Sequence, residues 1–101
     1  MSVVRPISDV IDVSRQHGNH FFDPETIAWF RSEIVDKVFG VFFVTSEQFD
    51  DESPRLFTIR RIDWDNGTIS TVGKFQQYET LEEAMTEVKR LALDWLNFPE
   101  P

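Results

Sequence analysis

The sequence predicts an α+β fold, a two-layer sandwich of two helices on one face of a three-stranded antiparallel meander, in the order α-β-β-β-α. Three observations support this prediction. An amphipathic segment begins at a proline near residue 24, strand-like runs flank an Asn66-Gly67 turn, and a long apolar stripe follows Thr80. With 101 residues, the chain has the usual size of one domain, and we expect a single domain over 1–101.

The N-terminal segment 1–20 gives conflicting signals. Its many β-branched residues favour a strand, whereas Ser8 followed by Asp9 is a possible helix start. We therefore expect an arm that is irregular or contains a short strand or helical turn.

The first helix is predicted over about 24–36. Asp23 precedes Pro24 in the order of a helix start, with a capping acid before a proline at the first helical position. Apolar residues then recur at three- and four-residue spacing and would face the core. Trp29 lies off that stripe, so it is a candidate for a contact outside the core.

Strands are predicted over 39–49, 55–64 and 68–75. In the first, both alternating sets of side chains are apolar, which is typical of a strand covered on two sides. Because short connections place both helices on one face, the other face, with Phe42, is expected to meet a partner. Asn66-Gly67 joins the last two strands, since this pair readily adopts the positive φ of a hairpin turn.

A second helix begins at Thr80, which with Glu83 forms a capping box. The apolar stripe that follows continues to about Leu96, with acids early and Lys89 and Arg90 late, as the helix dipole favours. Residues 97–101 form a tail that we expect to fray.

Charge and composition exclude several classes of function. Eighteen acidic and ten basic residues give a net charge of −8, which disfavours broad binding to nucleic acid or to anionic membranes. The absence of cysteine excludes disulfides and thiolate chemistry. Without a signal peptide or membrane span in the sequence, we expect a cytoplasmic protein.

Three stretches of this sequence resemble a family of small uncharacterised proteins encoded by phages and plasmids. These are Phe21-Phe22-Asp23-Pro24-Glu25-Thr26, the stretch from Phe43 to Phe49 (FVTSEQF), and the stretch from Thr71 to Tyr78 (TVGKFQQY). The resemblance covers about residues 20–92. It implies an accessory protein of a mobile element and assigns no activity, cofactor or catalytic residue.

The residues that could carry catalysis or bind a metal are sparse. His17, His20 and Asp23 have the ligand types of a metal site, but Gly18 and Pro24 interrupt the helix that would gather them, so a polar loop is the preferred interpretation. Neighbouring residues of a strand face opposite sides, so a Ser46 nucleophile would have no base in the adjacent acid. We therefore predict no enzyme and no cofactor, and leave the role of the two histidines open.

A nucleic-acid surface is the second of two alternatives for function. Arg55, Arg60, Arg61 and Lys74 lie on two neighbouring strands among aromatic residues, the composition of a sheet that stacks bases, and double-stranded-RNA-binding domains share the predicted element order. The net charge argues against it. Arg60 and Arg61 also face opposite sides, and cross-strand pairing with Glu47 or Glu79 would occupy them.

The sequence thus favours a non-enzymatic protein-interaction module that also forms a homodimer. The first alternative is an acidic DNA mimic that inhibits a nucleic-acid-binding host protein, because a compact acidic domain can imitate duplex phosphates. The expected partner contacts are the aromatic or charged positions that one core does not clearly use: Trp29, Phe42, Asp50, Asp51, Glu52 and Trp64.

Overall fold

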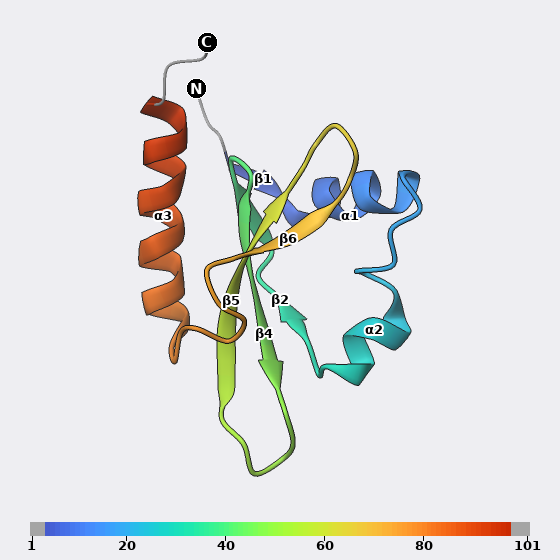
Figure 1. The fold of residues 1–101 in the computed structure, drawn as a ribbon, viewed down its shortest axis with the longest axis vertical. Helices are drawn as coiled ribbons and strands as arrows, with labels where there is room; N and C mark the ends of the chain where they lie inside the picture. Colours follow the sequence, from blue (N-terminus) through green and yellow to red (C-terminus); the bar gives the residue numbers. More distant parts are fainter. Residues whose placement is uncertain (1–3, 98–101) are drawn as a thin grey trace.

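A computed structural model describes residues 4–97 as an antiparallel sheet with helices on both sides (Figure 1). The strand order is β1-β3-β4-β5-β6, and β2 pairs with the far end of β4. In chain order the elements are β1 (Val4–Pro6), α1 (Ile7–Gln16), α2 (Pro24–Trp29), β2 (Glu33–Ile34), β3 (Lys37–Phe39), β4 (Phe42–Gln48), β5 (Arg55–Ile62), β6 (Ile69–Val72) and α3 (Leu81–Asn97).

The α+β class and the antiparallel sheet are confirmed, whereas the predicted number and order of elements are wrong. Strand β4 pairs with β5 along its whole length, from Phe42 opposite Arg61 to Gln48 opposite Arg55. Its other edge is shared by β3 and β2, two strands that the sequence did not predict. Strand β4 is therefore the centre of the sheet.

The N-terminal arm contains more structure than predicted. After the short strand β1, helix α1 runs for ten residues and buries Val10 and Ser14 completely. Val4 does lie in a strand, but Val10 and its β-branched neighbours in α1 form the buried side of an amphipathic helix, because the sheet beside α1 offers an apolar surface to cover.

The predicted helix over 24–36 ends at Trp29, and this is a second correction. Asp23 and Pro24 do occupy its cap and first position, although the Asp23 side chain caps no backbone amide. Arg31 then has a positive φ of 49°, and the chain turns into β2, where Ile34 pairs with Thr45. A six-residue helix has little stability of its own, so strand pairing of β-branched residues overrides the helical spacing.

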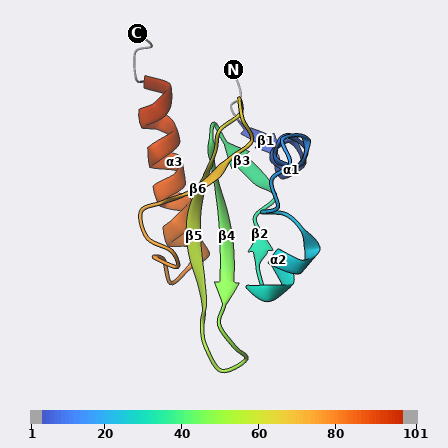
Figure 2. The ribbon, with the colours of Figure 1, turned by 45° about the vertical axis from the view of Figure 1, so that its right-hand side comes forward.

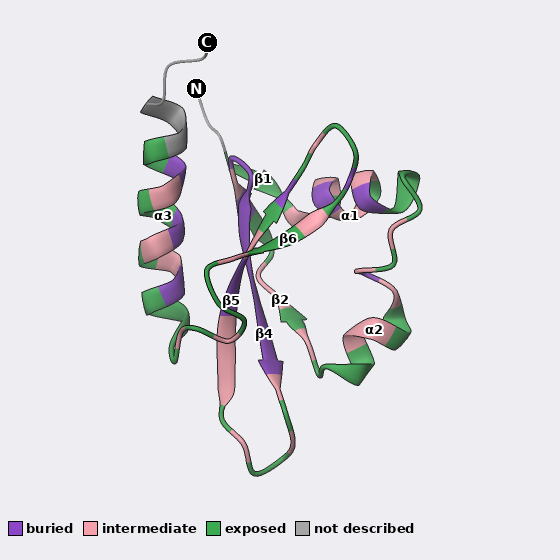
Figure 3. Ribbon diagram, in the orientation of Figure 1, coloured by how far each residue is buried: buried purple, intermediate pink, exposed green. Residues whose placement is uncertain are grey.

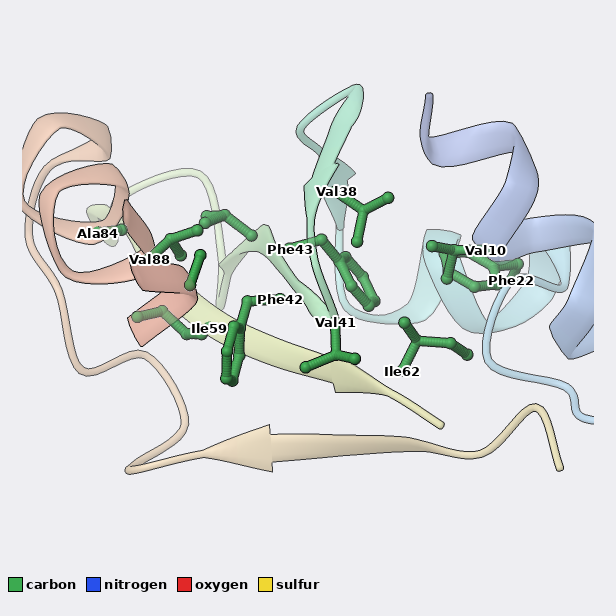
Figure 4. Close-up of a cluster of buried hydrophobic side chains, with 12 residues drawn as sticks. Val10, Phe22, Val38, Val41, Phe42, Phe43, Ile59, Ile62, Ala84 and Val88 are labelled. Carbon is green, nitrogen blue, oxygen red and sulfur yellow. The ribbon is translucent and has the colours of Figure 1, made fainter. Parts of the chain in front are cut away.

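The sheet is covered on both faces, so the molecule has three layers where two were predicted (Figures 1 and 2). Helix α3 lies on one face and α1 on the other. Figure 4 shows Phe42 and Ile59 on the side of Ala84 and Val88 of α3, and Phe43 on the opposite side. There Phe43 packs on Phe21 and Phe22, whose ring centroids lie 6.3 and 6.1 Å away.

The ends of the long elements follow the sequence closely. The Glu83 amide donates to the Thr80 hydroxyl over 3.1 Å at the start of α3, as the capping box predicts. Gly67 has a φ of 73° between β5 and β6, as the Asn-Gly turn predicts. Apart from Asn97, the last residue of α3, the predicted tail over 97–101 lies outside the described residues.

Helix α2 differs from the other two helices because it has no buried residue (Figure 3). It lies on the same side of the sheet as α1, next to β2 (Figure 2). The candidate site lies around this helix.

Candidate functional site

Four exposed aromatic side chains gather at the end of α2. Trp29 is 82% exposed and Phe49 is 85% exposed, and together with the half-exposed Phe30 and Phe75 they line a hollow of about 280 Å³. Exposed apolar side chains that gather in this way mark interaction sites more often than scattered ones do. We call these four residues the aromatic surface.

Three separate segments supply the aromatic surface. Trp29 and Phe30 end α2, and the Phe30 carbonyl accepts the Gln48 amide over 3.3 Å, which ties α2 to the end of β4. Phe49 follows directly on β4. Phe75 follows β6, and its ring meets that of Phe30 edge to face, with centroids 6.3 Å apart. Only the tertiary fold brings these segments together.

A second and larger pocket, the α2 pocket, lies between α2 and the sheet. Its volume is about 350 Å³, and Phe30 and Phe75 separate it from the hollow of the aromatic surface. The lining is mainly apolar, from Phe21, Ile27, Phe30, Ile34 and Phe75. The sheet contributes two polar residues, Thr45 and Arg60, and the segment around α2 adds Thr26 and Ser32.

A buried carboxylate lies next to this pocket. Glu47 is 3% exposed, and its carboxylate accepts hydrogen bonds from the hydroxyls of Thr45, over 2.6 Å, and Thr58, over 2.8 Å. Arg60 Nη2 lies 3.4 Å from Glu47 Oε2. The cross-strand pairing predicted for Arg60 is therefore confirmed with Glu47, and both carboxylate oxygens have partners.

The Arg60 guanidinium is held between polar and aromatic groups. Its Nε donates to the Thr45 hydroxyl over 3.1 Å and its Nη1 to the Thr71 hydroxyl over 2.7 Å. Its carbon lies 5.2 Å from the ring centroid of Phe21 and 5.4 Å from that of Phe75. Burial lowers the pKa of Arg60 below its ordinary value, and the charge of Glu47 opposes that shift.

The chain after β6 is fixed to the same cluster. The Gln76 amide donates to the Thr58 hydroxyl over 2.8 Å, and its side-chain amide donates to the Glu47 carbonyl over 3.0 Å. Gln76 has a positive φ of 57°. These two bonds position the neighbouring Phe75, so the buried cluster and the aromatic surface share one support.

Three acids, Asp50, Asp51 and Glu52, form an acidic loop that borders the aromatic surface, because it begins directly after Phe49. Asp50 shapes the loop, since its carboxylate accepts the Ser53 hydroxyl and amide, each over 2.8 Å. Hydrogen bonding from Ser53 lowers the pKa of Asp50 below its ordinary value. Asp51 pairs with Arg31, and both Asp51 and Glu52 are exposed.

The predicted contact residues divide into two groups. Trp29 and the acidic loop 50–52 lie around the aromatic surface, whereas Phe42 and Trp64 do not. Phe42 is only 8% exposed, because the sheet face that was expected to be open is covered by α3. Trp64 is half-buried beside the turn before β4, where its indole N–H donates to the Gly40 carbonyl over 3.2 Å.

Neither histidine lines one of these two pockets. His20 Nδ1 lies 2.7 Å from Asp23 Oδ2, while His17 lies against Gly67 in the turn between β5 and β6. Within residues 4–97, no three His, Cys, Asp or Glu side chains form a group that could hold a metal ion. Arg55 reaches Glu33 at 3.8 Å and also donates to the Ser46 hydroxyl.

Sequence reasoning did not select Phe49, Phe75 or Glu47 as site residues. Phe49 and Phe75 were assigned to strands, but β4 ends at Gln48 and β6 ends at Val72. The three acids that directly follow Phe49 could have indicated that this ring lies beyond the strand. Nothing local indicated that Glu47 is buried, since this depends on Thr58 and Arg60 of the neighbouring strand.

Of the comparisons with known proteins, the one with family models gives a match. The model of a family of unknown function (DUF7447) matches residues 7–89, a range that includes α1, α2, all but the first three strand residues, and about half of α3. No curated protein and no solved structure matches the chain. Among the described residues, no helix combines the length and apolar character needed to cross a membrane.

Proposed function

The chain belongs to this family of unknown function, DUF7447, and we propose that it is a non-enzymatic protein-interaction module that binds its partner through the aromatic surface. The observation that carries the proposal is the exposure of Trp29 and Phe49 on one hollow. Leaving such rings in water forgoes the free energy that their burial would provide, roughly 25 cal/mol per Å². A partner that covers them recovers it.

The charges around the aromatic surface indicate the chemistry of the partner. Asp51 and Glu52 are exposed directly beyond Phe49, on a chain whose net charge is −8. Opposite charges at the rim of an interface speed association and orient the partner. The expected partner is therefore a protein segment with an aromatic or aliphatic anchor followed by lysine or arginine.

The biological setting is a further part of the proposal. The three stretches that resemble phage and plasmid proteins are the basis for proposing an accessory role in a mobile element. Such a protein would act on a host or phage protein in the cytoplasm. Its acidic surface would keep it from binding nucleic acid directly.

Quantitative affinity capture with matched variants tests this function. We expect Trp29→Ala and Phe49→Ala each to weaken capture of a specific protein at least tenfold, since aromatic anchors dominate interface energies. Leu93→Ala removes an apolar side chain on α3 that is also well exposed, at 60%, and should leave capture unchanged. Equal capture by all variants would contradict the proposal.

The same experiment separates the acidic DNA mimic from the interaction module. Reversing the charges of Asp51 and Glu52 should weaken capture moderately and mainly slow association. If the charge reversal instead abolishes capture, while duplex DNA competes and the two aromatic variants behave as wild type, the partner is held by electrostatic imitation of DNA.

A further inference from the structure

We propose that the α2 pocket binds a small, neutral aromatic molecule that carries a carbonyl-type hydrogen-bond acceptor. The ligand would lie between α2 and the sheet, with its acceptor toward Arg60. This inference goes beyond the proposed function, because the α2 pocket and the aromatic surface share only two walls, Phe30 and Phe75.

The size and lining of the pocket support a ligand of this class. Its volume of about 350 Å³ falls within the range of about 300–1,000 Å³ that is usual for small-molecule sites. Such sites are mostly apolar with a few placed polar groups, as this one is. Since α2 has no buried residue, its Ile27 is only half-buried beside the pocket, and a ligand there would give it further contacts.

An aromatic ligand fits the walls best. The rings of Phe21, Phe30 and Phe75 border the pocket from three different segments of the chain. Aromatic rings favour offset or edge-to-face neighbours, and Phe30 and Phe75 already meet edge to face. A flat ring in the pocket would meet these walls in the same way.

The need for an acceptor follows from Arg60. A guanidinium has five N–H donors, and in the described part of the chain three side chains accept from that of Arg60: Thr45, Thr71 and Glu47. The remaining donors belong to a side chain that is only 12% exposed and lines the pocket. A carbonyl oxygen at this position would accept from them in place of water.

The neutrality of the ligand follows from Glu47. This carboxylate already balances the charge of Arg60 at 3.4 Å. An anionic ligand would add a second negative charge beside a 3% exposed carboxylate, and a cationic ligand would add a second positive charge beside Arg60. Either would leave an uncompensated charge in an apolar pocket, which is costly.

Fluorine NMR on the full chain tests the proposal with four probes of similar size. They are para-fluoroacetophenone, para-fluorotoluene without the acceptor, para-fluorobenzoate as the anion and para-fluorobenzylamine as the cation. We expect the ketone to bind tightest, with a Kd on the order of 1 mM for so small a probe. The toluene should bind about tenfold more weakly, because it lacks the hydrogen bond to a charged donor.

Two variants locate the binding. Ile27→Trp places a ring in the pocket from α2, which contributes no buried residue, so it should abolish ketone binding without unfolding the chain. Arg60→Lys keeps a charge beside Glu47 but removes the planar donor fork, so the ketone should lose its advantage over the toluene. Circular dichroism checks that each variant is folded. If Arg60→Lys unfolds, a folded Thr45→Val variant replaces it. This substitution frees the Arg60 Nε for the ligand, so the affinity advantage of the ketone over the toluene should increase.

Three results would overturn the proposal: no saturable ketone binding, an anion or cation that binds as tightly as the ketone, or unchanged binding to folded Ile27→Trp. A fluorophenylalanine peptide that binds while the free ketone does not would also overturn it, because the pocket would then take an anchor residue of a protein partner. Trp29→Ala separates the two proposals, since it should weaken partner capture and leave ketone binding intact.

Discussion

At the scale of single residues, the buried pair of Glu47 and Arg60 has the strongest expected effect on stability. Taking two charges out of water is costly, and their attraction offsets this cost only where further hydrogen bonds satisfy both groups. The hydroxyls of Thr45, Thr58 and Thr71 provide those bonds. The pair is thus tolerated in the core because threonines on three neighbouring strands, β4, β5 and β6, surround it.

Removing one member of this pair should be far worse than removing both. Glu47→Leu leaves Arg60 with a buried, uncompensated charge, and we expect it to lower the free energy of unfolding by about 3–5 kcal/mol. Glu47→Leu combined with Arg60→Met should recover most of that loss. The control is Arg90→Ala on α3, which breaks only exposed ion pairs and should lower the free energy of unfolding far less than Glu47→Leu does. Urea unfolding measures all three, and equal losses in the single and double variants would contradict this account.

The acidic loop should depend on pH through Asp50. Hydrogen bonds from Ser53 hold the folded pKa of Asp50 below the ordinary value of about 3.9. A lowered folded pKa means that the loop is stabilised above the ordinary pKa, and that this stabilisation is lost as the pH falls through the lowered value. The Ser53 amide signal in an NMR titration should therefore change with a midpoint below 3.9. Asp50→Ala should abolish the change, and a midpoint above the ordinary value would refute this role.

At the scale of elements, the turn between β5 and β6 is fastened to the end of α1. The Asn19 side-chain amide donates to the Gly67 carbonyl over 2.7 Å. A Cβ at Gly67 would lie 2.8 Å from the Val13 carbonyl oxygen and 3.0 Å from the His17 Cβ. This close approach connects the N-terminal arm to the hairpin, which explains why the segment is ordered although its local sequence signals conflict.

Two glycines test this connection as a matched pair. Gly18 and Gly67 both have positive φ, 77° and 73°, but a Cβ at Gly18 would meet nothing within 4 Å. Gly18→Ala should therefore cost only the backbone strain, about 1–2 kcal/mol. Gly67→Ala should cost clearly more, because its Cβ also displaces α1. Thermal unfolding compares them, and similar losses of stability would show that α1 and the hairpin are not closely packed.

At the scale of the whole molecule, the chain covers both faces of its own sheet. The homodimer was predicted from an open face around Phe42, but α3 covers that side chain. Self-association stays a prediction, and the aromatic surface is now where we expect it to occur. Among the exposed large apolar residues, Trp29 and Phe49 are the most exposed and border the same hollow.

Two charged substitutions distinguish core from interface. Phe42→Asp places a carboxylate against α3, and we expect the chain to unfold. Trp29→Asp should leave the fold intact and shift a dimer to monomer in light scattering at increasing concentration. A wild-type chain that is monomeric at high concentration would remove the homodimer, and a folded Phe42→Asp variant would contradict the burial of that ring.

Local signals in the sequence were sufficient for features that depend on neighbouring residues. The Thr80 cap, the Asn66-Gly67 turn and the central strand with two apolar faces are all present in the structure. The pairing of Arg60 with Glu47 was one of two alternatives in the sequence, the other being Glu79, and the folded sheet decided between them. Trp29 was also selected correctly as lying outside the core, from its position off the apolar stripe.

Long-range contacts settled the remaining features. Helix α2 ends at Trp29 because the following residues, despite their helical spacing, pair with β4 as strand β2. The N-terminal arm, whose sequence signals conflict, forms α1 because it packs on an apolar face of the sheet. The α2 pocket and the aromatic surface draw on segments that are distant in sequence. The periodicity of a helix or strand shows which of its sides is apolar, but not which element will cover that side. The α2 pocket and the aromatic surface could therefore be identified only from the tertiary structure.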